Sequence, residues 1–217
     1  MIDLYEYENN LYAQNINYIG GVDEVGRGPL IGPVVASCVV LPKDFVLEGL
    51  DDSKKLSEKK RDKFYSYIIE NALAYGIGII GPDVIDEVNI YQASKLAMLE
   101  AIKQVKEQLP LEHVLIDAMP LDLDIPSTSI IKGDSKSISI VAASVVAKVT
   151  RDKMMYDLDL KYPEYGFAKH KGYPTKLHLE KIKEYGLIDG YRKTYGPVKE
   201  LLEERKWVIY SLVKIDL

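Results

Sequence analysis

One stretch, residues 18–33 with the sequence Y-I-G-G-V-D-E-V-G-R-G-P-L-I-G-P, constrains the fold of this chain more than any other. A short apolar run ends in two adjacent carboxylates, Asp23 and Glu24, and Arg27 follows between two glycines. A strand that ends in two acids and then enters a flexible basic loop contributes little to a core. Such a sequence is suited to hold a divalent cation beside a phosphate.

Side-chain alternation poses a geometric problem for these two acids. In a strand over Tyr18–Val25, Asp23 faces one side of the sheet and Glu24 faces the other. We therefore expect the chain to bend at residues 26–29, where glycine permits positive φ and close backbone approach. The alternative is a hairpin with two solvated acids in its turn, although such a turn does not require an arginine.

The sequence D-E-V-G-R-G-P-L-I-G-P resembles the signature of type 2 ribonuclease H, in particular its bacterial ribonuclease HII branch. The resemblance extends over about residues 18–198 and includes D-S-K-K at 52–55 and G-Y-P-T at 172–175. It implies an α/β fold of the ribonuclease H-like type, a mixed β-sheet flanked by helices. It also implies a single catalytic domain over residues 1–217, in which 196–217 form a small C-terminal helical extension.

The hydrophobic pattern of the chain agrees with an α/β fold. Apolar runs rich in β-branched residues predict further strands at 30–41, 74–80, 113–118 and 127–132. Apolar residues at helical spacing and capping residues predict helices after Ser57, over 82–108 with a break near Asn89, over 137–162 and over 196–217. This order predicts a mixed sheet covered by helices, although periodicity alone leaves several α/β topologies open.

The composition excludes several classes of protein. The chain has 217 residues and one cysteine, Cys38, so an intramolecular disulfide is impossible and a cytoplasmic location is expected. Residues 1–17 contain acids and no basic residue, which is unlike a signal or transit peptide. No stretch approaches the length of a membrane-spanning helix, so we expect no membrane association. The net charge of −5 argues weakly against a nucleic-acid partner, but binding requires only a local basic face.

Four acids stand at predicted strand or helix ends, and the resemblance assigns the family's metal ligands and catalytic residues to them: Asp23, Glu24, Asp117 and Asp134. Carboxylates are the ligands of hard cations, and two such ions about 4 Å apart can clamp both oxygens of an in-line displacement at phosphorus. The resemblance therefore implies two divalent metal ions, Mn²⁺ or Mg²⁺. Taken alone, Asp117 suits a loop hydrogen bond, and Asp134 suits a helix N-cap. We interpret Asp152 as an ion-pair partner of Lys148 one turn earlier.

A second group of residues is implied to bind the substrate: Gly26, Arg27, Gly28, Tyr173, Lys54 and Asn89. RNA differs from DNA at the 2′-hydroxyl, and the resemblance places the backbone of residues 26–28 on that group. Tyr173 is implied to contact the ribonucleotide and stack on the next sugar, whereas Lys54 and Asn89 are implied to lie near the bound strand. The alternatives are that Tyr173, one of 16 tyrosines, packs in a turn and that Asn89 caps a helix.

The resemblance implies a metal-dependent endoribonuclease acting on RNA–DNA hybrids and on duplex DNA containing single ribonucleotides, with cleavage 5′ to the ribonucleotide. We expect a monomer, and W-V-I-Y-S-L-V-K at 207–214 is not a clear copy of a sliding-clamp motif. Two alternatives stay open. One is a nuclease or transposase of the same fold acting on DNA, and the other is a non-catalytic nucleic-acid-binding module with a structural cation.

Overall fold

The computed structural model describes residues 3–47 and 57–213, with the backbone alone over 205–213. The strands are β1 (Ile19–Val25), β2 (Val34–Val40), β3 (Ala74–Ile80), β4 (His113–Asp117) and β5 (Ser127–Ile130). The helices are α1 (Glu6–Tyr12), α2 (Glu58–Asn71), α3 (Pro82–Val88), α4 (Ile90–Lys106), α5 (Ile138–Lys161), α6 (Phe167–His170), α7 (Lys176–Tyr185) and α8 (Gly196–Val213), with the short 3₁₀ helix η2 (Gly133–Ser135).

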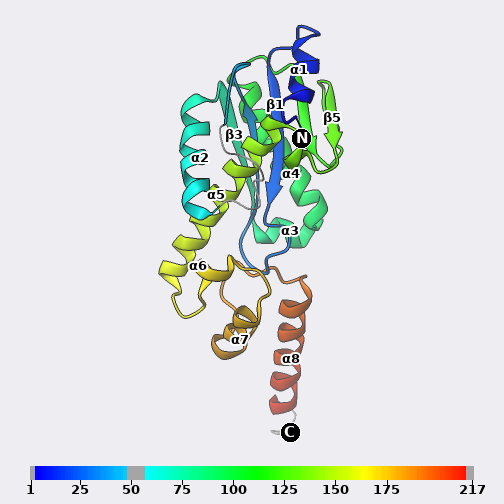
Figure 1. The fold of residues 1–217 in the computed structure, drawn as a ribbon. Coiled ribbons are helices and arrows are strands. Elements are labelled where there is room, and N and C mark those ends of the chain that lie inside the picture. The colour runs from blue at the N-terminus through cyan, green and yellow to red at the C-terminus, as the bar shows by residue number, and fades with distance from the viewer. Residues whose placement is uncertain (1–2, 48–56, 214–217) are drawn as a thin grey trace.

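The strands form one mixed sheet in the order β3-β2-β1-β4-β5. β1, β2 and β3 pair antiparallel, whereas β4 and β5 run parallel to β1. Figure 1 shows β1 in the middle of the sheet, with its carboxyl end directed toward the lobe that holds α6, α7 and α8. The predicted α/β architecture is confirmed, and β3 has the predicted bounds.

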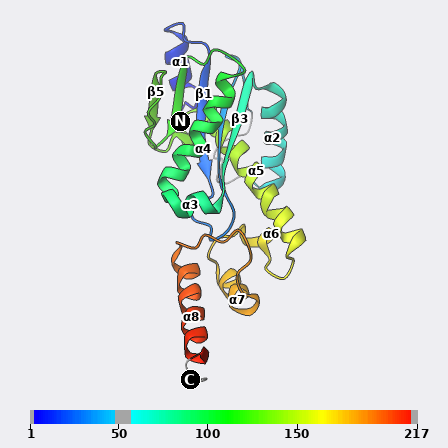
Figure 2. The same ribbon diagram turned by 180° about the vertical axis from the view of Figure 1, so that it is seen from behind.

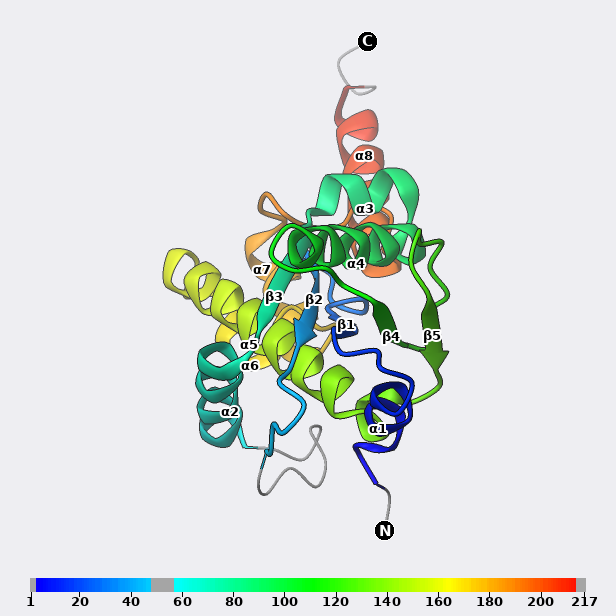
Figure 3. The same cartoon turned by 90° about the horizontal axis from the view of Figure 1, so that it is seen from above.

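Two helical layers cover the sheet. Figure 3 shows α4 on one face and α5 on the other, with α2 beside α5. The layer under α4 is the largest apolar cluster, with fully buried Val22, Ala36 and Met98. The layer under α5 contains Val39, Ile68 and Val146. Both faces of β1 and β2 are therefore covered, which explains their nearly continuous apolar sequences.

The approach of α5 to β1 is unusually close because of Gly21. A Cβ atom on Gly21 would lie 2.0 Å from the carbonyl carbon of Ser139 in the first turn of α5. Small residues of α5, including Ala142 and Ala143, allow such packing and are fully buried, and the Ser37 hydroxyl donates a 2.7 Å hydrogen bond to the Ala143 carbonyl. The start of α5 is thus held directly against the middle of β1.

The N-terminal segment has a structural role that we did not predict. Glu8 of α1 is 1% exposed, and its Oε1 accepts hydrogen bonds from the Ser137 hydroxyl (2.6 Å) and the Ser139 amide (3.0 Å). Ser137 is the N-cap of α5 and accepts from the Ile140 amide. A carboxylate at a helix N-terminus is favourable because it meets unpaired amides and the positive end of the helix dipole.

A separate small cluster forms the lobe beyond the carboxyl end of β1. It includes the buried residues Ile31, Phe167, Tyr191 and Val198. The C-terminal helix does not cover the sheet: residues near its start pack on this small cluster, and the rest of α8 runs away from the sheet (Figures 1 and 2). The physical reason is that Gly196–Val213 begins after the chain has left the sheet.

Another expectation about the elements is modified. The second strand begins at Val34 rather than residue 30, because the segment before Pro33 binds the C-terminal lobe through its backbone, as described below. The helix pair does break at Asn89, and Ser57 does cap α2 by accepting from the Lys60 amide. Among the described helices, none combines the length and apolar character of a membrane span. The prediction of a single catalytic domain stays a prediction.

We expect Gly21→Ala to destabilise the fold, because its methyl group would overlap the backbone of α5. Overpacking of this severity should cost about 3 kcal/mol, which corresponds to roughly 6–12 °C in melting temperature for a chain of this size. Gly81→Ala is the matched control, since a Cβ atom added at Gly81 would have no heavy atom within 4 Å. Thermal melts of both variants check this, and equal melting temperatures would contradict it.

Candidate active site

The four predicted acids line one cavity. Its volume is about 390 Å³, and it opens at the carboxyl end of β1 beside α5. The lining residues are Asp23, Glu24, Val25, Arg61, Asp117, Asp134, Ser144, Val145, Lys148 and Tyr173. The acids come from three separate parts of the chain, so the tertiary fold has brought together the residues that the sequence singled out.

Asp23 and Glu24 reach this cavity without a break in the strand between them. The chain bends within the predicted range, at Gly26 with φ +93°, but β1 stays paired with β2 through Val25, so this bend does not separate the two acids. The parallel ladder to β4 ends earlier, at Val22. Beyond Val22, the edge of β1 is therefore open toward the cavity, and both carboxylates can line it. The hairpin alternative with solvated acids is wrong, because Asp23 is only 7% exposed.

Asp117 and Asp134 are tied together through one backbone hydrogen bond. Asp117 is the last residue of β4, and its Oδ1 accepts from the Gly133 amide at 2.6 Å. Asp134 follows in η2 and is 7% exposed. The alternative role of Asp134 as a helix N-cap is wrong, because Ser137 caps α5.

The cavity places negative charges close together. Burial raises the pKa of Asp23 well above its ordinary value, and the neighbouring Glu24 carboxylate raises it further. Burial also raises the pKa of Glu24, whereas the Arg27 guanidinium, 3.5 Å from Glu24 Oε1, opposes that effect. Asp117 raises the pKa of both groups by repulsion. An arrangement that disfavours its own ionised form is one that a bound cation would stabilise.

This donor set fits a hard divalent cation. All four acids supply oxygen ligands, and no histidine or cysteine lines the cavity. Among the described residues, no group of three or more possible ligands converges on a single point. Mg²⁺ or Mn²⁺ bound here would therefore complete its coordination shell with waters and substrate phosphate oxygens rather than with protein ligands alone.

The structure adds three polar residues that we did not predict for the site. Arg61 reaches the cavity from α2, and Ser144 and Lys148 reach it from α5. Lys148 also forms the expected ion pair with Asp152 at 2.5 Å. The four-residue spacing of Ser144 and Lys148 places them on one helix face. The spacing of these residues in the sequence did not indicate which face of α5 is oriented toward the acids.

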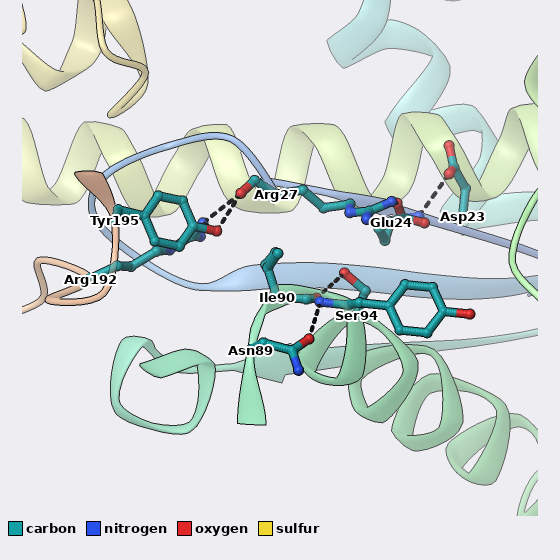
Figure 4. A network of polar contacts seen from close by, with 9 residues as sticks. Asp23, Glu24, Arg27, Asn89, Ile90, Ser94, Arg192 and Tyr195 are labelled. Carbon is teal, nitrogen blue, oxygen red and sulfur yellow. Dashed lines mark hydrogen bonds and ion pairs between the residues drawn. The ribbon is translucent and has the colours of Figure 1, made fainter. Parts of the chain in front are cut away.

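The loop 26–28 lies against Tyr173. A Cβ atom on Gly28 would lie 3.3 Å from the Tyr173 ring. The backbone explains this contact, because the Leu30 amide donates to the Gly172 carbonyl at 2.8 Å. Tyr173 itself is 40% exposed at the cavity rim. Figure 4 shows the Arg27 side chain extended along β1 toward Glu24.

A buried histidine pair supports the backbone of Tyr173. The His170 and His178 rings stack with centroids 4.2 Å apart. His178 Nδ1 lies 2.9 Å from the Tyr173 carbonyl oxygen, and its Nε2 lies 2.8 Å from the Tyr191 hydroxyl. A carbonyl only accepts, so Nδ1 carries the proton and Nε2 accepts from Tyr191. These histidines, which show no zinc-ligand spacing in the sequence, pack the turn that presents Tyr173.

Among the described residues, Asn89 does not line the cavity. Asn89 caps α4 by accepting from the amides of Tyr91 and Gln92, so the capping alternative is confirmed and its substrate role stays a prediction (Figure 4). Lys54 lies outside the described residues, and its role also stays a prediction. Lys171 is occupied locally, since its ammonium donates to the Ala168 carbonyl and lies over the Tyr156 ring.

Comparison with known proteins agrees with this geometry. A family profile described as ribonuclease HII matches residues 20–195. A ribonuclease HII from Bacillus cytotoxicus is 57% identical over 204 residues, which are 94% of this chain and 78% of that protein. The crystal structure of the ribonuclease H2 from Pyrococcus horikoshii has a TM-score of 0.73 and 27% identity, over 86% of this chain and 97% of the other. A ribonuclease HIII solved in complex with Mn²⁺ has a TM-score of 0.64 at 17% identity, covering 89% and 72%, and shows the fold alone.

The mixed sheet and its acid-lined cavity thus define a nuclease of the ribonuclease H type 2 class. Within that class, the chain belongs to the ribonuclease HII family. Membership supports ribonuclease H activity on RNA–DNA hybrids. The predictions of a monomer, of a cytoplasmic location and of no clear sliding-clamp motif stay predictions.

We expect the stability of the chain to fall on acidification because of His178. Burial lowers the pKa of His178 to about 4, so the unfolded chain, with an ordinary histidine pKa, takes up the proton first. The contribution of the neutral His178 to the free energy of unfolding is therefore complete above about pH 6.5. It is lost between about pH 6.5 and 4, by about 1.4 kcal/mol per pH unit for one proton. Urea denaturation across this range measures the slope. His178→Gln should be less stable at neutral pH but show a shallower slope, and parallel slopes would exclude His178 as the cause.

Proposed function

We propose that this chain hydrolyses the RNA strand of RNA–DNA hybrids and also incises duplex DNA on the 5′ side of a single embedded ribonucleotide, using two divalent metal ions, Mn²⁺ or Mg²⁺. One observation carries the proposal. The cavity that holds four acids is bordered by a glycine-rich loop and an exposed tyrosine, which are chemically suited to a ribose.

The reaction is a displacement at phosphorus. A water oxygen forms a bond to the phosphorus atom on the 5′ side of the ribonucleotide, and the bond from phosphorus to the 3′ oxygen of the preceding nucleotide breaks. The leaving oxygen takes a proton to become a 3′-hydroxyl, and the ribonucleotide keeps a 5′-phosphate. When bound, divalent ions would supply Lewis-acid activation of the water and stabilisation of the leaving oxygen.

Acidic and basic residues of the chain would have different roles in this reaction. Asp23, Glu24, Asp117 and Asp134 would hold the ions, because they supply the oxygen ligands of the cavity. Arg61 and Lys148 line the same cavity and supply positive charge where a substrate phosphate would enter among the acids.

Selectivity for RNA would come from the rim of the cavity. The backbone of residues 26–28 can approach a ribose closely, because two of these three residues have no side chain. The Tyr173 ring adjoins Gly28, so its hydroxyl would contact the ribonucleotide while its ring stacks on the next sugar. A nuclease that acts on DNA alone has no need of this loop, and a non-catalytic module has no need of four clustered acids.

The test is cleavage of a DNA duplex containing one ribonucleotide beside its all-DNA counterpart, with and without Mg²⁺ or Mn²⁺. We expect metal-dependent cleavage of the first duplex only, and we expect Asp23→Asn to lower the rate at least about a thousandfold, or about 4 kcal/mol of transition-state stabilisation. Mass spectrometry of the products should identify a 3′-hydroxyl and a 5′-phosphate.

A second readout separates loss of the metal site from misfolding. Without metal, Asp23→Asn should fold at least as stably as the wild type, because it removes a buried charge that its neighbours repel. Added Mg²⁺ or Mn²⁺ should raise the melting temperature of the wild type more than that of the variant. Cleavage of both duplexes would indicate a general nuclease. Binding without cleavage would indicate a non-catalytic module.

Tyr173 should matter most where a single ribonucleotide meets DNA. We expect Tyr173→Ala to lower kcat/KM on the single-ribonucleotide duplex by about tenfold to a hundredfold, which is the scale of a lost stacking contact. The loss on a long RNA–DNA hybrid should be smaller. Tyr173→Phe is the matched variant, because it keeps the ring and removes the hydroxyl. An equal loss on both substrates would contradict a role at the junction.

A further inference from the structure

Arg192 is a fully buried arginine whose donors converge on the loop 26–32. It lies between α7 and α8, and it is 0% exposed. Its Nη2 donates to the carbonyl oxygens of Gly26 (2.6 Å) and Gly32 (2.8 Å), and its Nε also donates to Gly32 (3.0 Å). Its Nη1 donates to the Arg27 carbonyl (2.9 Å) and to the Tyr195 hydroxyl (2.9 Å). All five guanidinium N–H groups are therefore used.

Tyr195 completes this arrangement. Its hydroxyl receives a hydrogen bond from Arg192 and donates its own to the Arg27 carbonyl at 2.6 Å. Figure 4 shows both side chains converging on the Arg27 carbonyl from the side of the loop that is remote from Glu24. The carbonyl of one loop residue thus accepts from two side chains that lie more than 160 residues later in the chain.

The segment that carries these side chains is itself fixed. The Asp86 carboxylate of α3 accepts from the amides of Lys193 (2.7 Å) and Thr194 (2.9 Å) and from the Thr194 hydroxyl (2.6 Å). The Arg192 amide in turn donates to the Leu30 carbonyl at 2.8 Å. Arg192 and Tyr195 therefore act from a rigid support rather than from a loose loop.

A second buried arginine blocks movement of the loop on another side. Arg151 of α5 donates to the Pro33 and Ile31 carbonyls. A Cβ atom on Gly26 would lie 2.3 Å from the Arg151 Nε. Gly26 is consequently packed against one guanidinium and hydrogen-bonded by the other, which leaves its peptide plane little freedom.

Fixing the carbonyls also fixes the amides. In a trans peptide, the C=O and the following N–H point in opposite directions. Holding the Gly26 carbonyl on Arg192 therefore turns the Arg27 amide away from Arg192, and holding the Arg27 carbonyl does the same for the Gly28 amide. Within the described residues, neither amide donates to another backbone group. Both donors are thus turned away from Arg192 and are not used by the described backbone.

Burying a guanidinium without a carboxylate is costly, so a simple packing role is a poor explanation of Arg192. No carboxylate lies within ion-pair distance of Arg192 in the part of the chain that the structure describes. Burial lowers its pKa, as expected for a charge that lacks an opposite partner. An apolar side chain would fill the space without this cost but would leave the loop carbonyls unpaired.

We propose that Arg192 and Tyr195 are positioning residues for 2′-hydroxyl selectivity, which hold the carbonyls of Gly26 and Arg27 so that the amides of Arg27 and Gly28 are preset to bind the ribose. The inference rests on the proposed function of the loop and extends it to two residues outside the cavity. It assigns the specificity of the loop to a hydrogen-bond network formed by the segment between α7 and α8.

The test measures discrimination rather than activity. Each variant is made in the full chain carrying Asp117→Asn, so that the substrate stays intact in Mg²⁺. Dissociation constants are measured by fluorescence anisotropy for a duplex with one ribonucleotide and for its all-DNA counterpart. The readout is the ratio of the two constants. Tyr195→Phe keeps the ring and removes the donor to Arg27, Arg192→Lys keeps the charge with fewer donors, and Tyr75→Phe on β3 is an exposed control.

We expect Tyr195→Phe to reduce the ratio about threefold to tenfold, the scale of one hydrogen bond. Arg192→Lys should reduce the ratio of dissociation constants at least about tenfold, since it removes several hydrogen bonds to the loop. The affinity of Tyr195→Phe and Arg192→Lys for the all-DNA duplex should equal that of the parent chain. The Tyr75→Phe control should keep the parent's ratio of dissociation constants. A lower melting temperature with an unchanged ratio in Tyr195→Phe would overturn the inference, even if Arg192→Lys fails to fold. If the parent chain itself shows a ratio of one, loop readout of the 2′-hydroxyl is wrong and this inference falls with it.

Discussion

The close contact between α5 and β1 at Gly21 is the constraint on which the rest of this structure depends. Because that residue has no side chain, the first turn of α5 rests on the backbone of the central strand. This contact sets the height of α5 above the sheet, and with it the positions of Ser144 and Lys148 beside Asp23. It also places η2, which immediately precedes α5, next to the end of β4. The acid cavity is a consequence of this packing.

Buried charges of opposite sign lie on the two sides of the loop that follows β1. On one side, buried carboxylates repel each other and their pKa values rise. On the other, Arg151 and Arg192 are buried with their donors on carbonyl oxygens, and desolvation lowers their pKa values, that of Arg151 to about 10. A fold selected for stability alone would avoid both costs. Their joint presence indicates that the clustering of the acids and the geometry of the loop have been favoured over maximal stability.

Much of the fold could be predicted from local pattern. The apolar run 74–80 became β3 with the expected bounds, Ser57 capped α2, and Asn89 separated α3 from α4. These features depend on neighbours within a few residues, which a sequence displays directly. The role of Glu8 could not be predicted, because its partners Ser137 and Ser139 lie about 130 residues away. The direction of α8 was likewise decided by where the chain leaves the sheet.

The sequence by itself determined the family, the four acids and the glycine-flanked arginine, because these depend on residue identity and order within short motifs. Only the tertiary structure decided that Asp23 and Glu24 share a cavity despite strand alternation, since this depends on where the ladder to β4 ends. It alone also decided that Arg61, Lys148, Arg192 and Tyr195 surround the loop and the acids. Their hydrogen bonds and cavity contacts join segments far apart in the chain, and no local spacing encodes such distances.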